Sequence, residues 1–178
     1  MEEFNKLDTI RVSELKGIIN SGTLVLEQNV EAINALNVFP VPDGDTGTNM
    51  LLTLRATGEE MAKNPDASTE EIIESMSRGA LLGARGNSGV ILSQFLRGLA
   101  QALAGHHVVD AYLMSRAFQA GAKGAYDAVS DPVEGTILTV ISKTSQAMEQ
   151  AIEKPNADLI IAFQEALLAC QAAVLKTP

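Results

Sequence analysis

Apolar residues recur every three or four positions along most of the chain, which is the spacing of one face of an α-helix. Gly or Pro stands where one apolar stripe stops and the next begins, as at Pro65, Gly105 and Pro155. No Asn-Gly or Asp-Gly pair joins two alternating apolar runs, so the pattern does not indicate hairpins. It predicts about seven or eight helices in an all-α bundle with short loops. The stripes are Leu26, Val30 and Ile33; Ile72, Ile73, Met76 and Ala80; Ile91, Phe95, Leu99 and Leu103; Val133, Ile137, Val140, Thr144 and Met148; and Ile160, Phe163, Leu167, Cys170 and Val174.

Length and boundary signals indicate how the chain is organised. Ser68 with Glu71 three residues later has the spacing of a capping box, so a helix is expected to begin there. The chain has 178 residues, without internal repeats, low-complexity tracts or a linker-like stretch. We therefore expect a single domain over residues 1–178.

Charge and cysteine usage exclude several classes of protein. There are 22 Asp and Glu residues against 13 Lys and Arg, a formal net charge of −9, which disfavours surfaces for nucleic acid or anionic membranes. Cys170 has no partner in the chain for a disulfide, so a reducing, cytoplasmic compartment is expected. Neither a signal peptide nor an uninterrupted apolar run of membrane-spanning length is present, so no membrane insertion is expected.

Two loops carry the residues that could bind a ligand or take part in a reaction. In the first, spanning 37–49, Pro40 and Pro42 keep the backbone extended, and Gly44 allows a turn that brings the carboxylates of Asp43 and Asp45 together. Two carboxylates suit a hard cation. The spacing does not fit an EF-hand, because position 12 would be Leu54 and not a bidentate Glu. Mg²⁺ completed by water and phosphate oxygens fits better.

The residues after the carboxylates are suited to phosphate. Thr46, Gly47, Thr48 and Asn49 lead into a helical stripe, so their backbone N–H groups are expected at a helix N-terminus. The second loop, 83–89, repeats this arrangement with Gly86, Asn87, Ser88 and Gly89, and Arg85 could supply charge to a transferring phosphoryl group. Together these features indicate a triphosphate site, although the chain has no P-loop and no dinucleotide fingerprint.

Plainer interpretations fit the same residues. The Asp43-Gly44-Asp45-Thr46-Gly47 run could be a helix cap and turn, in which the side chains satisfy orphan N–H groups. Glycines spaced by three from Gly83 to Gly89 could simply permit close helix packing. The pattern alone leaves both interpretations open beside the phosphate site.

Three motifs in order closely resemble the N-terminal nucleotide-binding domain of the kinase component of bacterial fatty acid kinase, in the dihydroxyacetone kinase L-subunit (DhaL-like) family. They are the segments 37–50, 83–89 and 131–136, and the resemblance covers nearly the whole chain. It implies an up-and-down antiparallel barrel of about eight helices, whose loops bind Mg-ATP at one end. It also implies that the chain is the N-terminal part of a longer protein, which could form a homodimer.

The resemblance also implies roles for individual residues. Asp43 and Asp45 would coordinate two Mg²⁺ ions that bridge the phosphates, and Asn37 stands nearest to a third ligand position of the family. Asp43, Asp45 and Arg85 would then be the catalytic residues. Nucleotide contacts would come from Thr46, Gly47, Thr48, Asn49, Asn87, Ser88, Gly89, Gly135 and Thr136.

The function implied is transfer of the γ-phosphoryl group of ATP to a fatty acid carboxylate, presented by a DegV-like fatty-acid-binding partner. A carboxylate is already ionised at neutral pH, so this nucleophile needs no general base. Two alternatives are a non-catalytic scaffold that binds Mg-nucleotide and a dihydroxyacetone kinase L-type subunit. The family's later glycine-rich segment has no counterpart before Pro178, so binding is expected to survive better than turnover.

Overall fold

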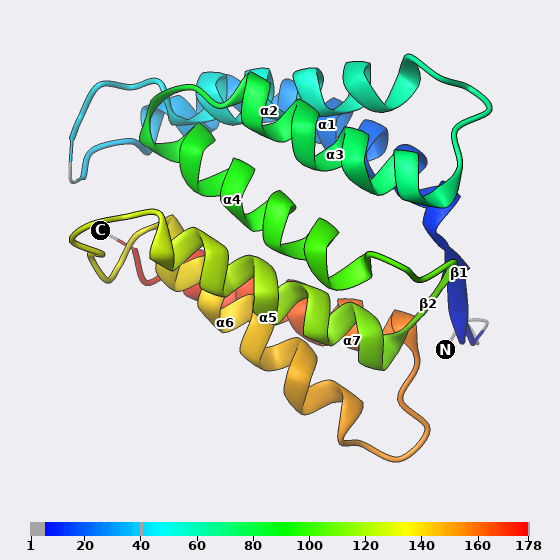
Figure 1. The fold of residues 1–178 in the computed structure, drawn as a ribbon. Helices are drawn as coiled ribbons and strands as arrows, with labels where there is room; N and C mark the ends of the chain where they lie inside the picture. Colours follow the sequence, from blue (N-terminus) through cyan, green and yellow to red (C-terminus); the bar gives the residue numbers. More distant parts are fainter. Residues whose placement is uncertain (1–5, 40, 178) are drawn as a thin grey trace.

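Seven α-helices and one pair of short strands make up the described part of the chain in the computed structural model, residues 6–39 and 41–177 (Figure 1). The all-α expectation is confirmed, with seven α-helices in those residues where about eight were expected. In chain order the elements are β1 Thr9–Arg11, the 3₁₀ helix η1 Val12–Glu14, α1 Leu15–Ala35, α2 Thr46–Ala62, α3 Thr69–Gly83, α4 Gly86–Leu103, β2 Val108–Asp110, α5 Ala111–Asp127, α6 Ile137–Ile152 and α7 Leu159–Val174.

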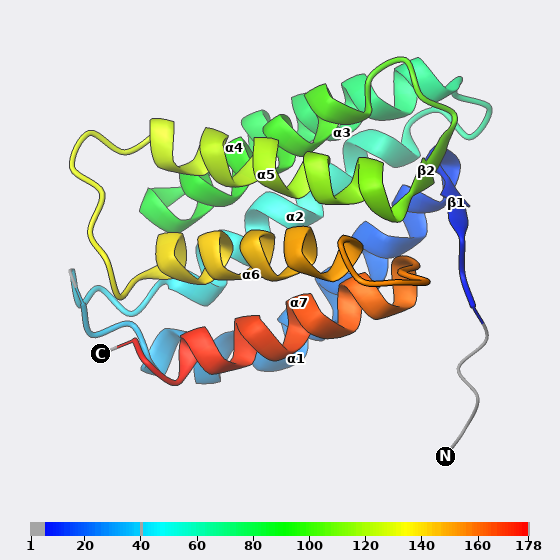
Figure 2. The ribbon, with the colours of Figure 1, turned by 90° about the horizontal axis from the view of Figure 1, so that it is seen from below.

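The helices run up and down, and each packs mainly on its neighbours in the sequence. Helices α1, α2 and α3 lie on one side of α4, and α5, α6 and α7 lie on the other (Figures 1 and 2). Helix α4 packs on α2, α3 and α5, so it joins the two halves. In the described residues, α1 has its main contacts with α2, and α7 with α6, so these two are the edge helices.

A small antiparallel sheet ties the two halves together at one end, called here the strand end. Thr9 in β1 lies opposite Asp110 in β2, and the backbone N–H of Val12 donates to the carbonyl of His107 at 3.0 Å. The sequence pattern did not indicate these strands, because three residues are too few to show a period of two. The sequence indicated only that a helix stops at Gly105.

The larger hydrophobic core lies toward the strand end. Its most deeply buried side chains include Val12, Met61, Leu103, Met114 and Leu159, which come from both halves of the molecule. A smaller cluster of Ile91, Ala125 and Leu138 joins α4, α5 and α6. The opposite ends of the helices therefore rest on a thinner apolar layer.

One predicted apolar face is wrong. The stripe beginning at Ile160 was expected to face the core, yet Phe163 is 37% exposed and Leu167 is 57% exposed. Helix α7 instead buries Leu159, Ala162, Ala166 and Ala173. The cause is that α7 is apolar around most of its circumference, so the sequence offers several stripes, and the smaller alanines allow closer packing.

Helices α4 and α5 approach closely at glycines. A Cβ built on Gly98 would lie 2.3 Å from the backbone oxygen of Ala120 in α5, and one on Gly121 would lie 2.7 Å from the ring of Phe95. Any larger side chain at Gly98 would push the two backbones apart. This contact fixes the position of α4, whose first residues form the second motif.

Candidate functional site

The three motif loops lie at the same end of the molecule, opposite the strand end, and we call this the motif end (Figures 1 and 2). It carries the loop between α1 and α2, the junction between α3 and α4, and the loop between α5 and α6. The antiparallel order of the helices produces this placement, because alternate connections fall at the same end.

Asn37 organises the first loop. Its side-chain nitrogen donates to Oδ1 of Asp43 at 3.2 Å and to the carbonyl of Val41 at 2.8 Å. Its side-chain oxygen accepts from the hydroxyl of Thr46 at 2.8 Å. Gly44 adopts a φ of +66°, which allows the turn between the two aspartates. Asn37, Asp43 and Thr46 are thus brought together, while the role of Asn37 as a metal ligand stays a prediction.

Asp45 stands at the N-cap of α2, yet its side chain caps nothing. Helices α3, α5, α6 and α7 behave differently, since their N-cap residues Ser68, Asp110, Thr136 and Asp158 each accept a hydrogen bond from the first turn of their own helix. The interpretation of Asp45 as a simple side-chain cap is therefore wrong. Its half-buried carboxylate forms no hydrogen bond with α2 and is available to a ligand.

The residue that caps α2 is Asn34, from the last turn of α1. Its side-chain oxygen accepts from the backbone N–H of Gly47 at 2.8 Å and of Thr48 at 3.2 Å, and its nitrogen donates to the hydroxyl of Thr48 at 3.0 Å. Sequence reasoning missed Asn34. The available signal was an asparagine in the last turn of α1, three residues before Asn37.

The first and second motifs pack directly against each other. The hydroxyl of Ser88 donates to the carbonyl of Thr46 at 3.3 Å. A Cβ on Gly86 would lie 2.2 Å from Nδ2 of Asn49, and one on Gly89 would lie 2.7 Å from the hydroxyl of Thr53. The close-packing interpretation of these glycines is therefore confirmed, and the packing also brings the beginnings of α2 and α4 together.

Asn49 carries a polar atom without a partner at this junction. The residue is only 8% exposed, and its side-chain nitrogen is buried without a hydrogen-bond acceptor among the described residues. Such an atom costs about 1–3 kcal/mol when it is left unsatisfied, so an acceptor supplied by a ligand would recover that cost. It lies beside Gly86 at the start of α4, a helix whose N-cap, Arg85, also makes no side-chain cap.

Arg85 forms no ion pair with Asp43 or Asp45. Its Nη1 donates to the carbonyls of Leu82 at 3.1 Å and Ala84 at 2.8 Å, which satisfies carbonyls at the end of α3. Its side chain is exposed. A catalytic role for Arg85 stays a prediction, and it would require the side chain to leave these carbonyls.

The third motif is braced by Glu134. The hydroxyls of Thr139 and Tyr126 both donate to its carboxylate, at 2.5 Å and 3.1 Å, and the N–H of Gly135 donates to the hydroxyl of Thr139 at 2.8 Å. The bond from Thr139, and then that from Tyr126, hold the pKa of Glu134 below its ordinary value. Burial is the main factor that raises the pKa of Tyr126, ahead of its hydrogen bond to Glu134.

The loop of the third motif therefore has a defined shape. Thr136 caps α6 through Leu138 and donates to the carbonyl of Val133. Gly135 and Thr136 lie at the motif end, but no hydrogen bond within residues 6–39 and 41–177 joins them to the first two motifs.

The donor set fits a hard cation held jointly with a ligand. In the described residues no group of three or more His, Cys, Asp or Glu side chains is placed to hold a metal. Asp43 and Asp45 supply two carboxylates, which is the usual protein contribution to Mg²⁺ when phosphate and water complete the shell. These residues fit magnesium bound together with a phosphate ligand.

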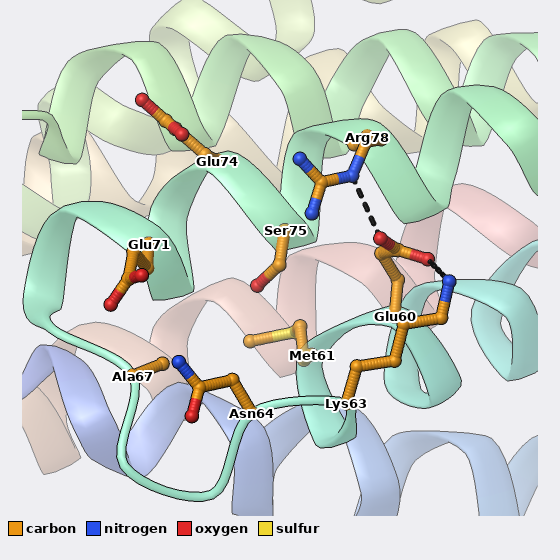
Figure 3. A pocket seen from close by; sticks show the side chains of 9 residues that line it. All are labelled: Glu60, Met61, Lys63, Asn64, Ala67, Glu71, Glu74, Ser75 and Arg78. Atoms are coloured by element: carbon orange, nitrogen blue, oxygen red, sulfur yellow. Dashed lines mark hydrogen bonds and ion pairs between the residues drawn. The ribbon is translucent and has the colours of Figure 1, made fainter.

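Two hollows in the surface lie away from the motif loops. One, of about 180 Å³, lies between the end of α2 and the start of α3 (Figure 3). There Glu60, nine-tenths buried, accepts from Nε of Arg78 at 2.7 Å and pairs with Lys63. The other, of about 490 Å³, adjoins β2 and the start of α5 and includes Tyr112 and Arg116.

Comparisons with known proteins place this arrangement in a family. A family model described as "DAK2 domain" matches residues 40–178. Curated relatives from Staphylococcus aureus strains USA300 and NCTC 8325 are 48% identical over 139 residues, and one from the bovine strain RF122 is 47% identical. All three are named only as uncharacterized proteins. The match covers 78% of this chain and 25% of each relative, so the chain spans about a quarter of their length. None of the helices in the described residues is long and apolar enough to cross a membrane.

Proposed function

The chain belongs to the DAK2 domain family, the DhaL-like nucleotide-binding domains of kinases, and on this premise we propose that its motif end binds Mg-ATP for phosphoryl transfer to a fatty acid carboxylate. The finer parts of this proposal are the magnesium, the acyl substrate and the residue roles. They rest on the resemblance of the three motifs and on the geometry of the site.

The observation that carries the proposal is the unpartnered amide of Asn49. It lies between two helix N-termini, one uncapped and one capped only from another helix, and a phosphate oxygen is the acceptor that this setting favours. Asp43 and Asp45 lie on the loop that leads to the first of these helices. A negatively charged protein can hold a polyanion there because a bound cation reverses the local sign.

The first two motifs have distinct tasks in this proposal. Asp43 and Asp45 hold magnesium, which when bound neutralises charge on the phosphates. The start of α4, with Asn87 and Ser88, and the amide of Asn49 orient the phosphate oxygens. An acyl carboxylate attacks without a general base, so the domain acts by positioning the reactants and by electrostatic stabilisation.

The acyl chain needs a carrier in this proposal because an apolar chain is poorly soluble in water and the resemblance places the acyl-binding site on a partner. We therefore propose a DegV-like fatty-acid-binding partner that brings the carboxylate to the exposed loops. A nucleotide-binding scaffold without chemistry and a dihydroxyacetone kinase L-type subunit remain the competing functions. Supplying full-length protein with ATP and either acyl-loaded partner or triose-loaded partner distinguishes all three by which acceptor is phosphorylated.

Calorimetry with Mg-ATP tests the site itself. Asp43→Asn and Asp45→Asn should each weaken binding by about tenfold or more, and chelation of Mg²⁺ should do the same in the unmodified protein. Asp66→Asn, on the exposed loop at the strand end, is the matched control and should bind normally. Equal affinity in all three variants would refute the metal assignment. Asn49→Ala should also bind less tightly, because it removes the unpartnered donor.

A further inference from the structure

Asn34, which lies in α1, accepts hydrogen bonds from the first N–H groups of α2, the role that an N-cap side chain usually has within its own helix. Its side chain makes three hydrogen bonds to Gly47 and Thr48, at 2.8, 3.2 and 3.0 Å. The approach is close because position 47 has no side chain, and a Cβ there would lie 2.7 Å from the backbone oxygen of Val30. The end of α1 and the start of α2 are therefore locked together.

Because Asn34 caps α2, the side chain of Asp45 is not needed as a cap. An aspartate at an N-cap normally turns its carboxylate onto the N–H groups of the first turn. Here those N–H groups already have the amide oxygen of Asn34, and Asp45 makes no cap bond. The carboxylate is left available to a cation on the loop side.

We propose that Asn34 is a positioning residue of the nucleotide site, which holds the first turn of α2 so that Asp45 and Thr46 are arranged to bind the magnesium–phosphate group. The inference rests on the proposed function. It also reassigns Gly47 and Thr48, whose N–H groups were expected to face phosphate. These groups bind the amide of Asn34, so the phosphate donors are the start of α4 and the side chain of Asn49.

Three variants of the chain test this assignment. Asn34→Ala removes all three hydrogen bonds, whereas Asn34→Asp keeps an acceptor for both N–H groups and loses only the bond donated to Thr48. Asn29→Ala is the matched control, because Asn29 is an exposed asparagine of the same helix whose side chain, among the described residues, bonds only to the carbonyl of Val25. Each variant is titrated with Mg-ADP by calorimetry, and amide hydrogen exchange is measured without nucleotide.

If Asn34 positions the site, Mg-ADP affinity falls in the order unmodified protein, Asn34→Asp, Asn34→Ala, with the last about tenfold weaker. Asn29→Ala should bind as the unmodified protein does. Without nucleotide, the amides of Gly47 and Thr48 should exchange faster in Asn34→Ala and remain protected in Asn34→Asp. Adding Mg-ADP to the unmodified protein should slow exchange at the start of α4 and leave these two amides unchanged.

The opposite order of affinity would overturn the inference. If phosphate displaces Asn34 and takes the N–H groups of Gly47 and Thr48, Asn34→Ala binds at least as tightly as the unmodified protein. Asn34→Asp then binds least, because its carboxylate competes with phosphate. Unchanged exchange in Asn34→Ala would overturn the inference as well. Absence of Mg-ADP binding by the unmodified protein would instead refute the proposed function, and the role of Asn34 with it.

Discussion

Replacing Gly98 with alanine should destabilise the protein, although alanine is the better helix former. The new Cβ would lie 2.3 Å from the backbone oxygen of Ala120, where ordinary contacts are 3.4 Å or more, so α4 and α5 would have to separate by about 1 Å. Overpacking of this kind costs about 1–3 kcal/mol, and a backbone oxygen cannot rotate away, so the upper end applies. Subtracting about 1 kcal/mol of gained helix propensity leaves a net loss of about 2 kcal/mol.

Gly22→Ala is the matched control for this substitution. Gly22 lies in the interior of α1, and a Cβ there would meet nothing within 4 Å. The same chemical change should therefore stabilise the protein by about 1 kcal/mol. Urea denaturation of the two variants should differ by about 3 kcal/mol in the free energy of unfolding. In thermal scans, Gly98→Ala should lower the melting temperature by about 4–8 °C.

The site should respond to Gly98→Ala as well. Helix α4 carries the second motif at its start, so a displacement of α4 also moves Ser88 relative to Thr46. We expect weaker Mg-ATP binding in Gly98→Ala and unchanged binding in Gly22→Ala. If both variants are stabilised equally, the close approach of α4 and α5 is not as described, and the reasoning fails.

Two further predictions concern the junction of the motifs and the strand end. Gly86→Ala should lower the free energy of unfolding by about 1–2 kcal/mol because of its φ of +56°, and it should also weaken nucleotide binding by displacing Asn49. Gly105 has a φ of +79° and open space around it, so Gly105→Ala should lower stability by a similar amount and leave nucleotide binding unchanged. Equal nucleotide affinities of the two variants in calorimetry would contradict this. The hydrogen bond from Lys63, and then that from Arg78, hold the pKa of Glu60 below its ordinary 4.5, so the stabilisation is complete above that pH and is lost as the pH falls through the lowered value. Urea midpoints of Glu60→Gln should therefore change less between about pH 5 and pH 3 than those of the unmodified protein or of Glu59→Gln, and parallel acid profiles would argue against this role.

Local signals in the sequence predicted local structure well. The capping box at Ser68 forms as expected, with Glu71 donating its N–H at 3.2 Å and accepting from Ser68 at 2.7 Å. The apolar stripe from Ile72 to Ala80 is buried. Both depend on residues within one helix and its first turn, and that information is contained in the spacing itself.

Features that depend on two distant segments were missed or wrong. Asn34 lies 13 residues from Gly47, and nothing local shows that its amide reaches the next helix. The choice among the apolar stripes of α7 likewise depends on which neighbour it meets. In each case, packing between helices decides among choices that the sequence leaves equal.

The single helix that joins the two halves has a mechanical consequence. The half built from α1–α3 carries the first motif, and its helix α3 leads into the second motif. The half built from α5–α7 carries the third motif, and α4 lies between the two halves. At the strand end the halves are held together by the pairing of β1 with β2 and by the larger hydrophobic core. The two halves are therefore expected to move apart more readily at the motif end than at the strand end. A ligand that contacts loops of both halves would restrict this movement.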